Sequence, residues 1–360
     1  TTANGKTELS TISGTPVNID SVPVTYFRRL TKDHTHFSPA LYRTLSRKLS
    51  KLKHSGEKTA IVHIHTWWNL VSVISCLIAV LHKIPVVLSP RGTLSSYSFG
   101  NKNNFIKNII FKLSQPLFRR CHFHVTSENE KNAIVSLTPF KSISLIPNLV
   151  SLPDPFKILD TQERRSYETK GQFNLLFLSR IEEKKGLELL FLALRGLRLK
   201  YRLNIAGSGE HLYVERLRDL ARSFHIDASI KWLGHQSADE KFDLIAESDM
   251  LILPSYDENF ANVVIESLAM GTPVLVTENV GLSDSIRNED LGWVCQADAT
   301  DLKGKIEDAF HDQEKREKTR QIAPEKIRSD YSDGEVCTQY IRMYKRILTS
   351  FVTKSKIHNL

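Results

Sequence analysis

Cysteine is scarce in this chain, and its four residues lie far apart. Cys76, Cys121, Cys295 and Cys337 form none of the closely spaced pairs that bind zinc. Four cysteines are also too few to form a disulfide framework in a chain of 360 residues. We therefore expect reduced thiols in a cytoplasmic protein.

The chain also lacks a long hydrophobic run. The longest near-continuous apolar segment, Leu70–Leu81, has about a dozen residues, whereas a membrane-spanning helix needs about 20. No signal peptide is recognisable, and we expect none. A composition of 41% hydrophobic and 25% charged residues is typical of soluble globular proteins, and the length leaves room for two domains.

Acidic residues are rare in the first part of the chain. Residues 1–150 hold 19 Lys and Arg against 6 Asp and Glu, whereas the remaining residues hold 30 against 34. This asymmetry predicts that the first domain faces an anionic surface. Segment 102–120 is the candidate, because its five cations accompany apolar residues without an intervening acid: Lys102, Lys107, Lys112, Arg119 and Arg120.

This pattern is typical of a helix lying on anionic lipid. The alternative is a core-packed helix with a solvated basic face. Nucleic-acid binding would also use such charge, but the stretch has no nucleic-acid fold signature, so we expect no nucleic-acid partner.

Short apolar runs alternate with amphipathic segments, which predicts a parallel α/β fold. Residues 1–20 are polar, and residues 22–27 indicate a later strand of the first domain. The prolines and charges of residues 149–171 predict an interdomain linker. Residues 302–320 predict one helix and residues 335–351 a final one.

Residues 254–276 combine a strand end, a loop, a helix and a second strand, and they carry two notable carboxylates. Residues 257–259 offer capping oxygens, and the helix start suits an anion or sugar oxygens. Glu266, on an otherwise apolar helix, should bind hydroxyls, because burying an unpaired carboxylate is costly. The alternative is that Glu258 is a helix-terminal charge and Glu266 a solvated one.

Three motifs occur in order in the second half: Arg180 with Lys185-Gly186, then Gly207-Ser-Gly209, then Glu258 with Glu266. Together they resemble the nucleotide-sugar half of retaining glycosyltransferases of the GT-B fold, in family GT4. The resemblance covers roughly residues 60 to 350.

The resemblance implies an α/β protein of two Rossmann-like domains facing a cleft, with a final helix crossing back to the first domain. The expected domains are 1–158 on the acceptor side, 159–334 for the nucleotide-sugar and 335–360 for the crossover helix. Because no apolar strand opens the chain, we expect the first domain to lack its usual first strand and Gly-rich loop.

Arg180 and Lys185 follow a predicted strand end, where open α/β sheets bind ligands, and both suit phosphate oxygens. By the resemblance they hold the donor diphosphate, Glu266 binds the ribose, and Glu258 contacts the transferred sugar as a catalytic residue. The alternative is a charged loop paired internally through neighbouring acids. The other expected donor-binding residues act through backbone N–H groups or close approach: Asn259, Phe260, Ala261, Asn262, Gly207 and Gly209.

Two further features qualify this donor site. Position 261 usually carries glycine in the family, and the alanine here narrows the approach of the sugar. No Asp-X-Asp motif is present, so we expect no metal and no cofactor, with cations and a helix dipole stabilising the leaving diphosphate. Gly234 and His235 are candidates to flank the base, from their position alone.

His65 ends a predicted strand and resembles the family's histidine that contacts the sugar near the reacting centre, which makes it the second catalytic candidate. His63 lies on the same side of that strand, and Arg91 ends the next strand; both are acceptor-side candidates. The alternatives are hydrogen-bonded strand histidines and a loop-anchoring salt bridge. Ser127 and Glu130 have capping-box spacing.

The resemblance therefore implies a retaining hexosyltransferase, and we expect it to work without a metal. By the same resemblance it would move a sugar from a UDP- or GDP-sugar to a lipid-linked or glycan acceptor, in lipopolysaccharide, capsule or exopolysaccharide synthesis at the inner membrane. One alternative is a non-catalytic nucleotide-sugar-binding protein or truncated subunit. The other is a different GT-B enzyme, such as an epimerase or phosphorylase.

Overall fold

The computed structural model divides the chain into two compact units, Thr1–Ile146 with Thr338–Leu360, and Pro147–Cys337. The described residues are 13–31, 35–55, 60–95, 97–98, 104–153 and 172–357. None of the helices in these ranges combines the length and the hydropathy that crossing a bilayer requires.

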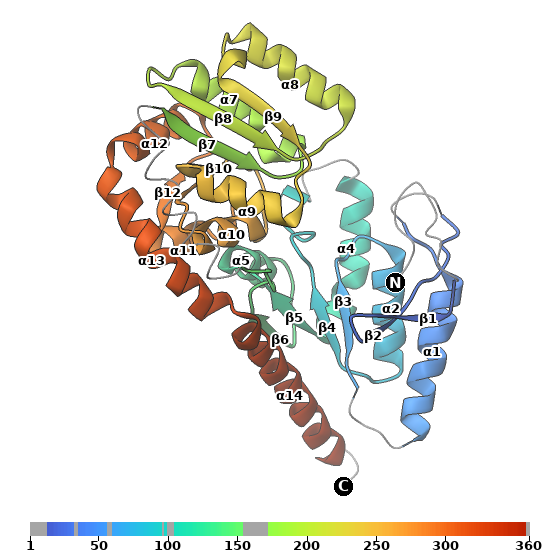
Figure 1. The fold of residues 1–360 in the computed structure, drawn as a ribbon. Helices are drawn as coiled ribbons and strands as arrows, with labels where there is room; N and C mark the ends of the chain where they lie inside the picture. Colours follow the sequence, from blue (N-terminus) through green and yellow to red (C-terminus); the bar gives the residue numbers. More distant parts are fainter. Residues whose placement is uncertain are drawn as a thin grey trace. The chain divides into compact units, whose positions relative to one another are not determined.

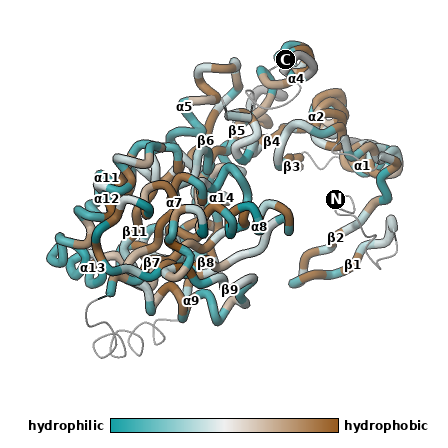
Figure 2. Tube along the Cα trace, turned by 90° about the horizontal axis from the view of Figure 1, so that it is seen from above, coloured by the Kyte–Doolittle hydropathy of each residue, from teal (hydrophilic) through white to brown (hydrophobic). Residues whose placement is uncertain are grey.

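A four-stranded parallel sheet, in the order β3-β4-β5-β6, forms the centre of the first unit (Figure 1). Trp67, Leu88 and Phe123 are fully buried in its core. Figure 2 shows α2 as apolar along most of its length. The elements of this unit are β1 Pro16–Ile19, β2 Val22–Thr25, α1 Pro39–His54, β3 Val62–His65, α2 Leu70–Leu81, β4 Val86–Ser89, α4 Asn104–Phe118, β5 Cys121–Val125, α5 Glu128–Leu137 and β6 Ser142–Leu145.

The strand predicted within residues 22–27 is present in the first unit as β2, but it lies outside the four-stranded sheet. Among the strands that the structure describes, β2 pairs with β1 alone, as an antiparallel hairpin with exposed Val17, Ile19 and Val22. Its two turn residues, Asp20 and Ser21, have φ angles of 47° and 66°. Positive φ at both positions is the geometry of a tight two-residue hairpin turn, which explains why two short β-branched runs pair with each other.

The last helix, α14 (Asp333–Ile357), belongs to the first unit from Thr338 onward, as the resemblance implied. Met343 and Ile347 are buried, and the Arg346 guanidinium donates to Ser144 Oγ at 2.7 Å.

The second unit contains a six-stranded parallel sheet in the order β12-β11-β10-β7-β8-β9. Counted along the chain from its first strand, this is the 3-2-1-4-5-6 order of the Rossmann fold. The elements are β7 Phe173–Leu178, η1 Glu183–Lys185, α7 Leu187–Arg195, β8 Tyr201–Ala206, α8 His211–Ser223, η2 Asp227–Ser229, β9 Ile230–Gly234, α9 Ala238–Glu247, β10 Met250–Leu253, α10 Asn262–Ala269, β11 Val274–Thr277, α11 Ser283–Asn288, β12 Gly292–Cys295, α12 Ala299–His311 and α13 Gln313–Tyr331.

Both faces of this sheet are covered, so its strands are apolar on both sides. Along β10, Met250 and Ile252 pack into a core with α7, α8 and α12. Leu251 and Leu253 alternate with them and pack into a second core with α9, α10 and α13. Figure 2 shows α13 as largely hydrophilic along its length.

Residues 302–320 were predicted as one helix, and this prediction is wrong. The chain forms α12 and α13, which meet at Asp312. The Asp312 carboxylate accepts from the backbone N–H of Lys315 at 2.9 Å, which caps the start of α13.

The observed division falls at 146/147 and 337/338, against predicted boundaries at 158/159 and 334/335. Most of the predicted linker lies outside the described residues.

Candidate functional site

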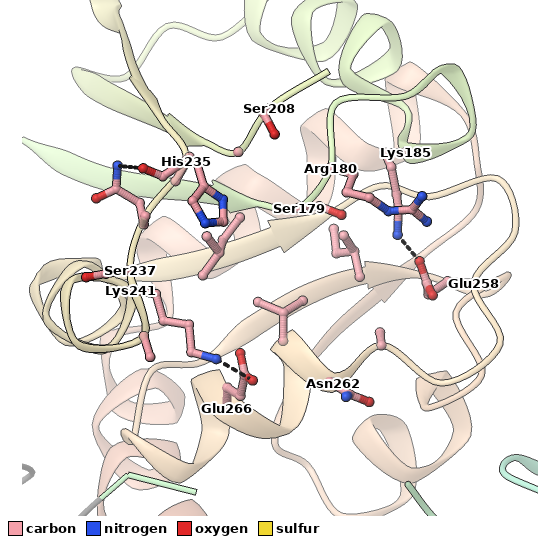
Figure 3. A pocket seen from close by; sticks show the side chains of 18 residues that line it. Ser179, Arg180, Lys185, Ser208, His235, Ser237, Lys241, Glu258, Asn262 and Glu266 are labelled. Carbon is pink, nitrogen blue, oxygen red and sulfur yellow. Dashed lines mark hydrogen bonds and ion pairs between the residues drawn. The ribbon is translucent and has the colours of Figure 1, made fainter. Parts of the chain in front are cut away.

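A cavity of about 560 Å³ lies at the carboxyl ends of the central strands of the second unit (Figure 3). The chain order of the sheet reverses between β7 and β10, because β8 and β9 lie on one side of β7 and β10 on the other. Neighbouring loops diverge at such a switch point, and ligands of open α/β sheets bind there. The lining residues follow β7, β8, β9 and β10: Leu178, Ser179, Arg180, Lys185, Ala206, Gly207, Ser208, His235, Gln236, Ser237, Ala238, Lys241, Leu253, Glu258, Ala261, Asn262, Val263 and Glu266.

A buried ion pair joins two loops of this cavity. Lys185, at the end of η1, donates to the Glu258 carboxylate, and the two side chains are 7% and 17% exposed. Gly186 follows with φ 71°, where a Cβ would collide with the carbonyl oxygen of Pro254, so only glycine allows this close crossing. Glu258 is also held through its backbone by Asn279 and Gly281. The pair is therefore fixed in position before any ligand arrives.

The second carboxylate, Glu266, lies in the second turn of α10 and is also paired. Its Oε1 accepts from Lys241 Nζ at 2.7 Å, and the two side chains are 11% and 23% exposed. Lys241 belongs to α9, whose first turn is held by a capping box between Ser237 and Glu240. In Figure 3 both ion pairs point into the same cavity from different elements.

Arg180 lines the cavity, but most of its side chain is exposed to solvent. Its guanidinium pairs with Glu182 at 2.6 Å, and its side chain is 69% exposed. The internally paired loop considered as an alternative therefore holds for Arg180 and not for Lys185. An exposed pair of this kind contributes little stability, so the guanidinium is available to a ligand at little cost.

The start of α10 differs from the prediction that residues 257–259 cap it. The N-cap is Ala261, without a side-chain cap, and the helix begins at Asn262. The loop residue Glu258 instead pairs with Val280 in an isolated bridge, which delays the helix. Ala261 has φ 71° and ψ 78°, a left-handed conformation that favours glycine.

The remaining donor-site candidates have different positions. Gly207 lines the cavity and has φ 144°, with no room for a Cβ against the Ser179 carbonyl. Asn262 lines the cavity and accepts from Asn148 Nδ2 at 3.0 Å. Asn259, Phe260 and Gly209 are not among the lining residues: Phe260 is buried against Tyr331, and Gly209 bridges Ile181. His235 lines the cavity, whereas Gly234 does not.

The first-unit candidates surround a separate polar network at the ends of β3, β4 and β5. His63 and His65 stack with ring centroids 4.4 Å apart. Arg91 has φ 54°, and its guanidinium donates to Tyr340 Oη at 3.4 Å. Glu130 completes only half of the predicted capping box: its N–H donates to Ser127 Oγ, but its carboxylate accepts from the N–H groups of Gly92 and Thr126.

The hydrogen bonds of this network have a fixed direction. The Ile146 carbonyl can only accept, so His124 Nε2, 2.9 Å away, must donate. In a neutral ring His124 Nδ1 then accepts from Ser89 Oγ at 2.7 Å, and Ser89 Oγ accepts from His63 Nε2 at 2.6 Å. His63 Nδ1 accepts from Tyr344 Oη at 2.6 Å. Both His63 nitrogens thus bond to protein groups, so binding an acceptor would require breaking one of these bonds.

Burial keeps these two histidines neutral. It lowers the pKa of His63 to about 3, and His65, His124 and Arg91 lower it further, because each of them disfavours a second positive charge at His63 when it is itself charged. Burial likewise lowers the pKa of His124 to about 4, although its bond to the Ile146 carbonyl opposes the shift. The neutral forms required by the hydrogen-bond directions are therefore those present at neutral pH.

Sequence reasoning missed Lys241, Ser89, His124 and Tyr344. A signal existed for the histidines, because His-X-His occurs twice at predicted strand positions, in β3 and again in β5. No comparable signal marks Lys241, whose partner lies on another helix, 25 residues away.

Two family models match the chain: Glycosyltransferase Family 4 over residues 7–152, and Glycosyl transferases group 1 over residues 160–326. An uncharacterized glycosyltransferase of Methanocaldococcus jannaschii is 25% identical over 342 residues, covering 91% of this chain and 85% of the relative. The N-acetyl-alpha-D-glucosaminyl L-malate synthase of Bacillus anthracis is 23% identical over 354 residues, covering 93% and 88%.

Among solved structures, Anabaena HepE in complex with UDP and glucose superposes with a TM-score of 0.68 at 16% identity. The match covers 91% of this chain and 87% of that chain. At this identity the likeness shows a shared fold. Since the two family models match both halves in order and the two-sheet architecture is that of the GT-B fold, the chain belongs to the GT4-family glycosyltransferases of the GT-B fold.

Proposed function

We propose that this glycosyltransferase moves a hexosyl group, with retention of configuration and without a metal, from a UDP- or GDP-sugar to a lipid-linked or glycan acceptor. We further propose that the reaction serves lipopolysaccharide, capsule or exopolysaccharide synthesis at the cytoplasmic face of the inner membrane. One observation carries the proposal. The switch-point cavity holds a buried lysine, two carboxylates and an accessible guanidinium within one space.

The donor diphosphate would take the two cations. Lys185 is a point charge and Arg180 a planar fork, and both suit phosphate oxygens. The start of α10 adds backbone N–H groups and a partial positive charge at the same cavity. These groups would stabilise the charge that develops as the diphosphate departs, because they are already in place before the reaction. HepE, which shares the fold, has been solved with UDP-glucose.

The two carboxylates would hold the neutral parts of the donor. Glu258 would accept from hydroxyls of the transferred sugar, and Glu266 from those of the ribose. In the proposed front-face attack the leaving phosphate takes the acceptor proton, so no side chain needs to serve as general base. His65, at the end of β3, stays the candidate of the first unit for contacting the sugar.

The surface of α4 supports the proposal of a lipid-linked acceptor at a membrane. Leu113 and Ile109 are 74% and 44% exposed, and Lys112, Arg119 and Arg120 are exposed beside them. Exposed apolar side chains rimmed by cations fit an anionic lipid surface. Lys107 instead donates to the Ser98 carbonyl, and Lys102 lies outside the described residues.

Thermal-shift screening of UDP-, GDP- and ADP-sugars tests the donor assignment, because a bound donor raises the unfolding midpoint. The matching donor should then yield a product whose anomeric configuration, read by NMR, equals that of the donor. Addition of EDTA should leave the rate unchanged.

Inversion of configuration would contradict the proposed mechanism. Donor binding with neither transfer nor hydrolysis would instead favour a non-catalytic binding protein, and a product formed with phosphate or without acceptor would favour another GT-B reaction.

A further inference from the structure

Lys241 makes the second ion pair of the cavity, and no motif of the sequence assigns it a role. It reaches Glu266 from a separate helix, α9, with its Nζ 2.7 Å from Oε1. Its ammonium group also lies 4.8 Å from the centroid of the Phe242 ring. The capping box at Ser237 and Glu240 fixes the turn from which Lys241 projects. The lysine is therefore held at both ends.

Glu266 is held on one side only. The residue is 8% exposed, and its Oε2 has no partner among the residues that the structure describes. Because Glu266 lines the cavity, this oxygen is accessible to a ligand there. A carboxylate without a fixed partner would sample several rotamers.

We propose that Lys241 is a positioning residue for nucleoside recognition. Its ion pair holds the Glu266 carboxylate in one rotamer, so that the carboxylate accepts from both ribose hydroxyls of the donor. Lys241 thereby sets the preference for ribonucleotides over nucleotides that lack these hydroxyls. This inference rests on the proposed nucleotide-sugar function.

The two lysines of the cavity have different tasks in this scheme. Lys185 is buried and pairs with Glu258, the carboxylate expected to contact the transferred sugar. Lys241 is more accessible, lies on α9 after β9, and shares its end of the cavity with His235, Gln236 and Ser237. Figure 3 shows the two pairs separated, with Lys241 and Glu266 near His235 and Ser237, and with Lys185 and Glu258 near Arg180.

Calorimetric titration with UDP and with 2′,3′-dideoxy-UDP tests the proposal in the full chain. The wild type should bind UDP at least tenfold more tightly, because hydrogen bonds to a charged group are strong. In Lys241→Met this preference should fall by about tenfold, mainly through weaker UDP binding. Lys241→Arg, which keeps the charge, should retain most of it, and the exposed Lys231→Met should behave as wild type.

The outcomes separate this inference from the function on which it rests. Failure of the wild type to bind UDP or any other nucleotide would overturn both. A wild type that prefers UDP, together with a Lys241→Met variant of undiminished preference, would overturn only the role of Lys241. An equal loss of affinity for both nucleotides in Lys241→Met would also overturn it, because a merely structural role weakens both alike.

Discussion

At the residue scale, Ala261 combines a strained backbone with a place in the cavity. Its φ of 71° costs a residue with a Cβ about 1–2 kcal/mol, whereas glycine adopts this region freely. Glycine in turn loses about 0.4–1 kcal/mol through the greater entropy of the unfolded chain. Ala261→Gly should therefore leave the unfolding midpoint unchanged or raise it slightly.

Ala261→Val gives the matched contrast, because a β-branched residue is a genuine outlier at positive φ. We expect a lower midpoint by thermal unfolding and weaker donor binding. A valine variant as stable as the wild type would contradict the backbone conformation at this position.

The Lys185–Glu258 pair makes a second prediction. Lys185→Met leaves a nearly buried carboxylate without its cation, which should destabilise the second unit by about 3 kcal/mol. The double variant Lys185→Met with Glu258→Gln removes both charges and should recover most of that loss in thermal unfolding. The rate of sugar transfer should fall at least about 100-fold in both variants, and the recovered stability of the double variant should not restore it.

If the double variant were as unstable as the single one, the charge pair would not be the source of the destabilisation. A double variant with substantial transfer would show that neither side chain serves the reaction.

A third prediction concerns the loss of folding stability at acidic pH, to which His124 contributes. The pKa of His124 is about 4 in the folded protein and ordinarily 6.5, so the unfolded chain binds more protons between these values. Stability from this group is complete above pH 6.5 and is lost as the pH falls towards 4, by up to about 1.4 kcal/mol per pH unit. In a unit of this size that loss lowers the unfolding midpoint by about 3–6 °C per pH unit.

His124→Gln should therefore show a shallower fall of the midpoint of the first unit between pH 6.5 and 4 than the wild type. The exposed His54→Gln serves as control. Equal slopes in all three proteins would show that His124 is not kept neutral by burial.

The sequence predicts the identity of the charged residues better than their partners. Lys185, Glu258 and Glu266 could be found because their spacing relative to strand ends is local. The lysine partner of Glu266 could not, because their contact joins α9 to α10 across the cavity. The fixed direction of the histidine network also depends on the carbonyl of Ile146, which no side-chain pattern encodes.

At the element scale, α4 has an exposed apolar side chain, Leu113. Leu113 is 74% exposed, and no other described element covers it. Leu113→Gln should reduce binding to phosphatidylserine-containing vesicles about tenfold, since burial of one leucine side chain is worth about 1.5–3 kcal/mol. Co-sedimentation measures this effect. Leu212→Gln on α8, where the leucine is 70% exposed, is the matched control.

Binding that is independent of anionic lipid would contradict the role of the cations on α4. A loss in Leu212→Gln equal to that in Leu113→Gln would show that the effect is not specific to this helix.

The strand, helix and strand predicted within residues 254–276 are present as β10, α10 and β11, because each buried strand is a short apolar run between polar turns. Two departures from the predicted elements, one in each unit, have local causes. The β1–β2 hairpin forms around Asp20 and Ser21 at positive φ, where neither residue is glycine. The α12–α13 break depends on one capping carboxylate, at Asp312, inside a run that remains helical in pattern.

At the scale of the whole molecule, the two units differ in whether they are formed by one continuous segment of the chain. The second unit is one continuous segment, Pro147–Cys337, whereas the first is assembled from Thr1–Ile146 and Thr338–Leu360. The predicted scheme of two domains and a crossover helix has this same plan. The switch-point cavity lies entirely within the continuous unit, which explains why all of its lining residues come from one segment of the sequence.

The split composition of the first unit determines when it can be completed during synthesis. Tyr344, which donates to His63, and the buried Met343 and Ile347 leave the ribosome only after the whole of the second unit. The histidine network of the first unit can therefore close only after residues beyond Cys337 have been translated, whereas the second unit can already fold by then. Nascent chains stalled before residue 338 should accordingly protect the second unit from protease and leave the first one open to cleavage.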